Sequence, residues 1–384
     1  MPWEKCSVET QRRGLARAML KGGHSVREIS RRFGVSRQTA YKFRARFLRE
    51  GESGLGNRSR RPHRSSEQKV KWYRRVLRLR RIRSSWGGRK LRWLLRQRFG
   101  RESRTLPAER TIQRWIQQAG LIPYRLVRRR AKRRSHVRAS RAYCSNAVWT
   151  FDLKGWFYTG DGTKIEPLTI RDLYSRYIFW VRPLAPRNEA AVRRVCRRLF
   201  RRYGLPRVIR CDRGAPFFGD GPHGFTRLSL WWWRLGIRVE FVRRGAINNN
   251  AHEQMHRVLK RELTLAWGLC AQTQRLERWR QHYNHARPHQ ALQMRVPASY
   301  YRLKPAPLPV LSNPNYPQLW LTRRVDRGGE ITLPSWRGSI GRAFGNLCVG
   351  LAPLGPRRYR VHFEQLVLGT LDLNASGKLL LTPY

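Results

Sequence analysis

The fold is decided by a short apolar segment that an acid interrupts, Val148-Trp149-Thr150-Phe151-Asp152. Its aromatic and β-branched residues predict a buried strand. A carboxylate in such a strand costs free energy unless a partner compensates for the water it loses. Asp152 is therefore a candidate functional residue.

Two more acids stand at the boundaries of predicted elements. Asp212 follows a short apolar strand predicted over 207–211 and precedes a glycine turn, which directs its carboxylate outward at the edge of a sheet. Glu253 stands near the start of a helix predicted over 250–267. The same face of that helix carries three residues at spacings of three, four and seven from Glu253: His256, Arg257 and Lys260.

Three carboxylates on separate elements can hold two divalent cations about 3.5–4 Å apart. Such a pair of ions activates a water or hydroxyl and stabilises the leaving oxygen of a phosphodiester. Mg²⁺, or Mn²⁺ in its place, suits oxygen ligands and keeps positions open for substrate. Asp152, Asp212 and Glu253 are thus candidate catalytic residues and metal ligands. The alternative, for any one of them alone, is that the acid neutralises nearby arginines.

Residues 146–300 predict a mixed α/β domain around these acids. Strands are expected over 147–158, 164–171, 177–181, 207–211 and 237–242, and helices over 189–203, 228–235, 250–267 and 272–285. The run Trp231-Trp232-Trp233 is interpreted as core packing rather than a base-stacking platform. Three other acids are interpreted as turn formers: Asp161, Asp220, and Asp172, which we expect to bond to backbone or to Ser175.

Residues 1–55 predict a helix-turn-helix DNA-binding domain. A first helix is expected over 8–20, a capping box at 25–28 opens a second, and a turn at 34–36 leads to a third over 36–48. The third helix would present four residues to the major groove: Arg37, Gln38, Tyr41 and Lys42. The alternative is an ordinary three-helix bundle with a solvated basic face.

Residues 66–124 predict a second helical domain, of helix-turn-helix or winged-helix type. Its last helix begins near Pro107 and carries Thr111 and Arg114 as expected DNA contacts. The segment 125–145 is a basic linker, which we expect to lie along phosphates. Residues 316–384 contain short strands separated by Gly and Pro, expected over 323–333, 347–351, 358–363 and 365–371, and they predict a small all-β barrel.

The charge of the chain indicates a polyanionic partner. Among 384 residues, 82 are Lys or Arg and only 23 are Asp or Glu, a formal net charge of +59. Nucleic acid fits this charge, because each phosphate contact releases counterions. A GC-rich genome would explain part of the arginine excess but not the scarcity of acids. An anionic membrane is the competing partner. It is disfavoured because no apolar run is long enough to span a bilayer, so we expect no membrane partner.

The cysteines predict neither a zinc site nor a disulfide framework. All six are scattered, without a Cys-x-x-Cys pair. No leader resembles a signal peptide. We therefore expect a cytoplasmic, nucleoid-associated protein.

At this point the sequence resembles a known family, the insertion-sequence transposases with a retroviral-integrase-type DDE core. The resemblance covers roughly residues 5–300. Its motifs are Trp149-Thr150-Phe151-Asp152-Leu153-Lys154-Gly155, the segment 168–178, Cys211-Asp212-Arg213-Gly214-Ala215-Pro216-Phe217, the segment 249–260 around His252-Glu253, and Tyr283-Asn284-His285-Ala286-Arg287-Pro288-His289. Asp212 and Glu253 are 41 positions apart, and Arg213 and Asn250 depart from the residues usual in the family.

The resemblance implies a multidomain protein: all-α helix-turn-helix domains, an α/β RNase H-like core and a further β-module. It implies that Asp152, Asp212 and Glu253 hold two Mg²⁺ or Mn²⁺ ions. It also implies that the N-terminal domains bind the terminal inverted repeats of the element in double-stranded DNA. Cleavage would free a 3′ hydroxyl that attacks target DNA, and joining two ends requires a homo-oligomer on DNA. From helical spacing, we expect Arg257 and Lys260 to position the phosphates of the end.

Two other functions compete with transposition. One is a DNA-binding regulator descended from a transposase, with an inactive core, which the intact set of three acids argues against. The other is an RNase H-type nuclease that processes RNA, which two predicted readers of duplex DNA argue against.

Overall fold

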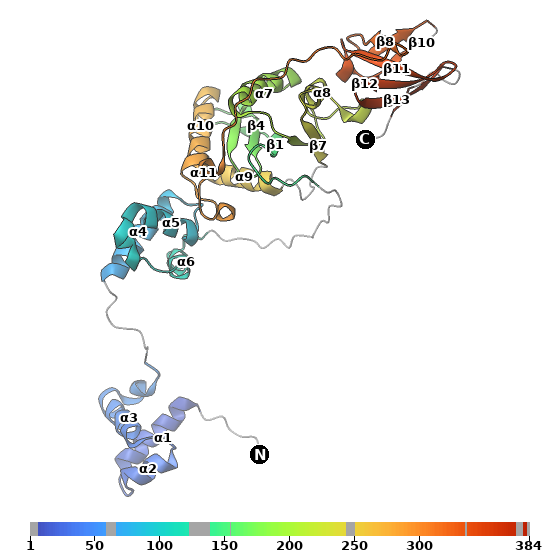
Figure 1. The fold of residues 1–384 in the computed structure, drawn as a ribbon. Helices are drawn as coiled ribbons and strands as arrows, with labels where there is room; N and C mark the ends of the chain where they lie inside the picture. The colour runs from blue at the N-terminus through green and yellow to red at the C-terminus, as the bar shows by residue number, and fades with distance from the viewer. Residues whose placement is uncertain are drawn as a thin grey trace. The chain divides into compact units, whose positions relative to one another are not determined.

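A computed structural model describes residues 7–58, 67–122, 139–153, 155–242, 250–334, 336–373 and 379–381, with backbone alone for 250, 251 and 379–381. The first part of the predicted basic linker, 125–138, lies outside the described residues. The chain divides into two compact units, Met1–Val70 and Lys71–Tyr384. Each is described by itself (Figure 1).

The first unit is three helices and a short 3-10 helix around a small apolar core. They are α1 (Val8–Lys21), α2 (Val26–Arg32), α3 (Arg37–Glu50) and η1 (Gly51–Leu55). Ser25 and Glu28 form the predicted capping box, and the Ser36 hydroxyl accepts from the Thr39 N–H to begin α3. Leu15, Ile29 and Phe43 meet in the core. The predicted three-helix arrangement is confirmed.

Three helices with a core of their own follow, and the first of them spans the boundary between the two units. They are α4 (Glu67–Ile82), α5 (Gly88–Phe99) and α6 (Glu109–Gln118), with η2 (Gly100–Thr105) between the last two. Trp72, Trp86, Leu91 and Ile112 are buried there. Gly88 allows the close approach of α5 and α6, because a Cβ at this position would lie 3.1 Å from the Glu109 carbonyl oxygen.

A five-stranded sheet follows, in the order β5-β4-β1-β6-β7 (Figure 1). Its strands are β1 (Val148–Leu153), β4 (Pro167–Asp172), β5 (Ile178–Pro183), β6 (Val208–Asp212) and β7 (Arg238–Val242). β1, β6 and β7 are parallel, whereas β4 and β5 are antiparallel to their neighbours.

Two predicted strands are divided in the structure. The strand expected over 147–158 is β1 followed by a separate β2 (Phe157–Tyr158), because Gly155 turns the chain with φ 80°. The strand expected over 164–171 is β3 (Lys164–Ile165) followed by β4. β2 and β3 pair with each other as a small ribbon outside the main sheet.

Helices cover both faces of the sheet. Trp149 and Phe151 of β1 point to the face covered by α7 (Glu189–Tyr203) and α8 (Arg227–Arg234), with the Trp149 ring 5.6 Å from Phe200 and the Phe151 ring 5.0 Å from Trp232. The other face contacts α9 (Asn250–Glu262), and α10 (Leu269–His285) packs against β5. α9 is shorter than predicted. The short helices are η3 (Pro222–Gly224), η5 (Gln290–Leu292) and α11 (Pro297–Tyr300).

The C-terminal strands form an open antiparallel sheet. They are β8 (Leu321–Arg324), β11 (Cys348–Gly355), β12 (Arg358–Phe363), β13 (Leu366–Asp372) and β14 (Leu379–Leu381), with β9 (Glu330–Leu333) and β10 (Trp336–Ser339) as a separate pair and η6 (Arg342–Phe344) between. The order is β14-β13-β12-β11-β8. Among the strands described, β14 and β8 do not pair, so the predicted barrel is not confirmed.

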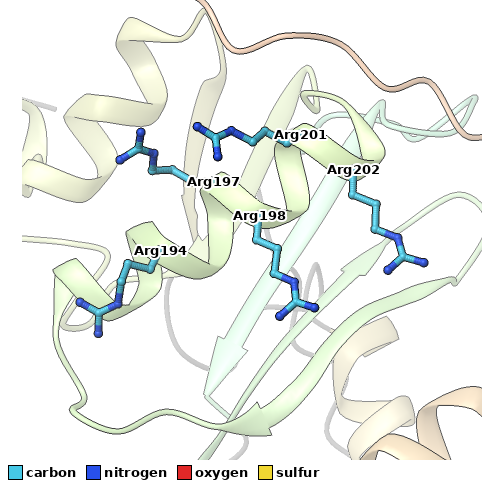
Figure 2. Close-up of a pocket in the computed structure, with 5 residues that line it drawn as sticks. All are labelled: Arg194, Arg197, Arg198, Arg201 and Arg202. Atoms are coloured by element: carbon cyan, nitrogen blue, oxygen red, sulfur yellow. The ribbon is translucent and has the colours of Figure 1, made fainter.

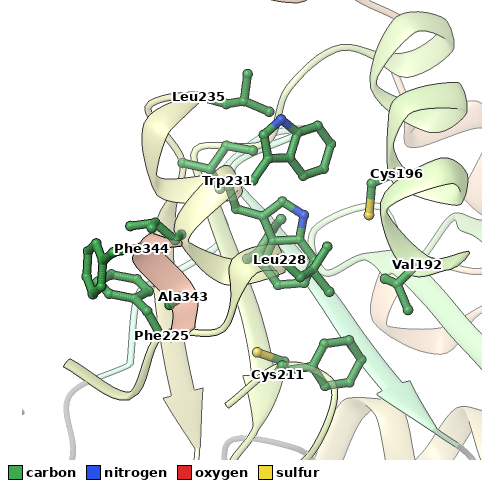
Figure 3. Close-up of a cluster of buried hydrophobic side chains, with 14 of the residues drawn as sticks. Val192, Cys196, Cys211, Phe225, Leu228, Trp231, Leu235, Ala343 and Phe344 are labelled. Atoms are coloured by element: carbon green, nitrogen blue, oxygen red, sulfur yellow. The ribbon is translucent and has the colours of Figure 1, made fainter. Parts of the chain in front are cut away.

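One hydrophobic core joins α7, α8 and the C-terminal sheet. Figure 3 shows Trp231 and Leu228 of α8 in the same cluster as Cys196 of α7, with Phe344 beside them. Trp232 is fully buried and Trp231 is 7% exposed, which confirms the tryptophan run as core packing. Within the part of the chain that is described, no helix is both long and apolar enough to cross a membrane.

Candidate functional site

The register of β1 and β6 brings two of the candidate acids to one end of the sheet. Thr150 pairs with Arg210 in a parallel ladder of constant offset. Asp152 and Asp212 each stand two residues further along, Asp152 at the penultimate position of β1 and Asp212 at the last position of β6. Because side chains alternate between faces, both acids share the face of Thr150 and Arg210, opposite the α7 and α8 core. The paired register of β1 and β6 ends at Thr150 and Arg210, so both acids follow it at the same end of the sheet.

His252 fixes the first turn of α9 on this same face. Its Nδ1 lies 2.8 Å from the Thr150 hydroxyl and its Nε2 lies 2.7 Å from the Thr169 hydroxyl. The side chain is buried, and this burial lowers the pKa of His252 well below its usual value, so the imidazole is neutral. Glu253 is the next residue of the helix and is half-buried. These contacts bring the start of α9, and with it Glu253, over β1 and β4.

His256, one turn further along α9, lies directly beside Asp152. Its Nε2 is 2.9 Å from the Thr169 hydroxyl and its Nδ1 is 3.6 Å from Oδ2 of Asp152. One potential ligand atom each from Asp152, His252 and His256 lies within 4.8 Å of the others. From the sequence, His256 is expected on the face of Glu253 without a role, and no role is expected for His252. His252 and His256 are four positions apart on one helix, and this spacing is the feature of the sequence that could have identified them as a pair.

The basic candidates near the acids differ in exposure. Arg257 and Lys260 are both exposed on α9, as contacts with a large anion require. Arg213, directly after Asp212, is also exposed, and its guanidinium lies 5.6 Å from the centre of the Phe218 ring. Its backbone N–H donates to the Val242 carbonyl at 3.2 Å, which fixes the turn after β6.

The candidate DNA contacts of the first unit share one surface of α3. Arg37, Gln38, Tyr41 and Lys42 are all exposed, whereas Ala40 and Phe43 between and after them are buried. In α6, Arg114 is exposed and Thr111 is half-buried.

Two of the acids interpreted as turn formers behave as predicted. The buried Asp172 carboxylate accepts from the Asn146 N–H at 3.0 Å, the Ser175 N–H at 2.7 Å and the Ser175 hydroxyl at 2.6 Å. Burial raises the pKa of Asp172 in spite of these bonds. Hydrogen bonds, first from Thr159 and also from Thr163, lower the pKa of Asp161 to about 2.

Together the fold and the site define a protein with a helix-turn-helix domain and an integrase-type α/β core. Residues 11–63 match the model of a helix-turn-helix domain, and residues 235–297 match that of an integrase core domain. The chain is also 27% identical over 198 residues to the insertion element IS407 uncharacterized 31.7 kDa protein of Burkholderia multivorans, over 49% of this chain and 67% of that relative. These findings confirm the predicted resemblance to an insertion-sequence transposase with an integrase-type core.

Solved structures with weaker likeness are retroviral integrases. The HTLV-2 integrase catalytic core domain, in complex with magnesium, is 13% identical and aligns with 42% of this chain and 100% of its own at a TM-score of 0.32. The simian T-cell lymphotropic virus intasome, in complex with the PP2A regulatory subunit B56 gamma, is 12% identical, with 64% of this chain and 85% of that chain covered at a TM-score of 0.32. Scores this low do not establish a shared fold.

Proposed function

We propose that the chain is a DNA transposase that cleaves and transfers DNA strands at Asp152, Asp212 and Glu253. The parallel register of Thr150 and Arg210, which aligns the first two acids, carries this proposal. Further support comes from the contacts of His252 that hold the start of α9 on the same face. The half-buried carboxylate of Asp152 suits a divalent cation, because its oxygens are hard ligands in a partly dry setting.

Each side chain has a part in this proposed reaction. The three carboxylates bind Mg²⁺ or Mn²⁺, and two such ions, when bound, supply activation of the attacking hydroxyl and stabilisation of the leaving oxygen. Arg257 and Lys260 contact phosphates of the transposon end from the exposed side of α9. The chain would act as a homo-oligomer on DNA, associated with the nucleoid, because two ends must be held together.

The chemistry consists of two in-line displacements at phosphorus. Water attacks the phosphodiester at the transposon end; a new P–O bond forms as the bond to the 3′ oxygen breaks, which frees a 3′ hydroxyl. That hydroxyl then attacks a target phosphodiester, and one P–O bond again replaces another. Neither step needs a covalent enzyme intermediate or ATP.

The N-terminal domains would select the DNA. Arg37, Gln38, Tyr41 and Lys42 of α3 read base edges of the terminal inverted repeat in the major groove. Thr111 and Arg114 of α6 make a second set of contacts with the same end.

Strand cleavage with defined variants tests this function. Full-length protein is incubated with end-bearing duplex oligonucleotides and Mg²⁺ or Mn²⁺. Because loss of a residue behind a metal ligand costs about 10–100-fold, we expect Asp212→Ala, which removes a ligand itself, to lose more than about 100-fold in rate. Asp220→Ala, an exposed acid eight positions away, is the matched control and keeps activity. Equal activity of the two variants would refute the assignment. A wild-type chain that binds ends but never cuts them would favour the regulator.

A further inference from the structure

His256 lies beside Asp152 and has no part in the proposed mechanism. Its side chain is 12% exposed, and it lies between the Thr169 hydroxyl and the Asp152 carboxylate. The hydrogen bonds of the Thr169 hydroxyl determine which ring nitrogen of His256 carries a proton towards Thr169 and which one faces Asp152.

The Thr169 hydroxyl has three polar neighbours but only one proton. It donates to the backbone carbonyl of Asp152 at 2.9 Å, since that oxygen can only accept. It must therefore accept from Nε2 of both His252 and His256, through its two lone pairs. Both imidazoles carry a proton at Nε2. The Nδ1 lone pair of His252 then accepts from the Thr150 hydroxyl.

Because Nε2 of His256 bonds to the Thr169 hydroxyl, Nδ1 is the ring nitrogen that faces Asp152, 3.6 Å from Oδ2. Two ligand atoms that each lie about 2.1 Å from the same ion are about 3 Å apart when the ligand–ion–ligand angle is a right angle. They are further apart when that angle is wider. The observed separation fits a pair of ligands on one ion.

We propose that Nδ1 of His256 is a further ligand of the ion held by Asp152, which gives this metal position a mixed nitrogen and oxygen donor set. The inference rests on the proposed function, because it takes Asp152 as a metal ligand. His252 is not a ligand, since both of its ring nitrogens bond to threonine hydroxyls. A nitrogen donor favours Mn²⁺ over Mg²⁺, which prefers oxygen. The position next to Asp152 should therefore prefer Mn²⁺.

Pulsed electron paramagnetic resonance of bound Mn²⁺ tests this directly in the full-length protein. We expect a ¹⁴N coupling in the wild type that His256→Asn abolishes, together with at least a tenfold loss of Mn²⁺ affinity. His285→Asn, an exposed histidine at the end of α10, is the matched control and keeps the coupling. Thermal melting shows whether His256→Asn is folded, and His256→Gln repeats the test with a different side chain.

The outcomes separate this inference from the proposed function. In one outcome the wild type binds Mn²⁺ and Asp212→Asn loses it, yet the wild type shows no nitrogen coupling. That result overturns the role of His256 alone. Absence of any Mn²⁺ binding overturns both. Coupling that survives His256→Asn also overturns the assignment.

A separate surface carries a second inference. The outer face of α7 holds five exposed arginines that line one shallow depression (Figure 2): Arg194, Arg197, Arg198, Arg201 and Arg202. Val192, Cys196 and Phe200 on the inner face pack into the core next to Trp149. The arginines therefore lie on the side of the sheet opposite Asp152 and α9.

These arginines carry like charges at short spacing along one helix, so they repel one another. Like charges three and four positions apart destabilise a helix. Within the described residues, no carboxylate forms a salt bridge with any of the five. A row from Arg194 to Arg201 extends about 10.5 Å along the helix, comparable to about three phosphates of one DNA strand along the duplex axis. Charge and spacing both fit a phosphate backbone.

We infer that the outer face of α7 binds the backbone of a DNA duplex, independently of base sequence and away from the cleavage site. Fluorescence anisotropy with a random-sequence duplex, over a range of salt concentrations, tests this. Arg194, Arg197, Arg198 and Arg201 are changed together to Gln in the full-length protein. Since each phosphate contact contributes about 0.9 to the slope of log K against log salt, we expect the slope to fall by about 3.

A variant of equal charge provides the control. Arg324, Arg327, Arg357 and Arg360 are exposed on the C-terminal sheet, and their change to Gln removes the same charge elsewhere. We expect a clearly smaller change in slope. Equal slopes for the two variants would mean that only total charge matters, and would overturn the inference. The inference would also be overturned if the α7 variant lost binding to anionic vesicles while its DNA binding stayed unchanged.

Discussion

Thr150 on β1 and Arg210 on β6 are direct partners in a parallel strand pair. This one pairing aligns Asp152 with Asp212, although 60 positions separate them along the chain. A slip of one residue would turn one acid towards the tryptophan core. The register of β1 against β6 therefore decides whether both acids lie on one face of the sheet.

The Thr169 hydroxyl is the centre of the polar contacts between β1, β4 and α9, so Thr169→Val should weaken both the fold and the site. An unsatisfied buried donor costs about 1–3 kcal/mol, and the variant leaves the Nε2 protons of His252 and His256 without their acceptor. We expect the free energy of unfolding of Thr169→Val, measured by urea denaturation, to fall by about 1–3 kcal/mol. We also expect this variant to bind Mn²⁺ more weakly. Thr322→Val on the exposed β8 is the control and changes neither. Unchanged unfolding of Thr169→Val would contradict the network.

Glu262 at the end of α9 joins the second helical domain to the core. It accepts from the Ser85 hydroxyl, the Arg287 guanidinium and, at 3.1 Å, from Nε1 of Trp279. Arg287 is 3% exposed in its side chain. Glu262→Gln leaves that cation without its counter-charge, and breaking a buried pair in this way costs about 3–5 kcal/mol. We expect a clear drop in melting temperature.

An exposed ion pair supplies the comparison for Glu262. Arg89 and Glu109 lie 2.9 Å apart with side chains 47% and 45% exposed. Such surface pairs contribute about 0–1 kcal/mol, so Glu109→Gln should barely shift the melting temperature. A similar shift for both variants would show that the buried pair is not what holds the two parts together.

Lys90 gives the second unit a stability that depends on pH. Burial, with the nearby Arg287, lowers the pKa of Lys90 to about 8. The unfolded lysine keeps its proton up to about pH 10.4, so the unfolded state binds more protons across that window. Stability from this group therefore rises as pH increases from about 8 to about 10. We expect Lys90→Met to melt at a higher temperature than the wild type at pH 7, with a difference that shrinks by pH 10.

Lys304→Met, at an exposed position, controls for a general effect of charge removal on these melting curves. A difference for Lys90→Met that stays constant between pH 7 and pH 10 would rule out the lowered pKa as its cause.

Gln38 and Tyr41 should affect recognition of DNA without affecting folding. Both are exposed on α3, and Tyr41 is 51% exposed. A bidentate contact with a base edge is worth about 1–3 kcal/mol of discrimination, so Gln38→Ala should lose about tenfold in the preference for the transposon end over random DNA. Competition binding measures this preference. Lys21→Ala on α1 is the exposed control, and an equal loss for both variants would argue against base reading by α3.

Much of the secondary structure was set locally and could be read from the sequence. The capping box of Ser25 and Glu28 and the cap at Ser36 involve residues three apart, so they predicted α2 and α3. The turn bonds of Asp172 to Ser175 were predictable for the same reason. The order of Asp152, Asp212 and Glu253 on strand ends and a helix start was also visible, because the apolar runs around them are short and distinct.

Tertiary structure alone decided what surrounds those acids and how the C-terminal strands associate. His252 contacts Thr150 across 102 positions, and Glu262 contacts Ser85 across 177. No local pattern encodes such pairs, because they depend on strand register and helix packing. The open order of the C-terminal sheet was missed for the same reason: alternation identifies each strand, but closure depends on which edges meet in space.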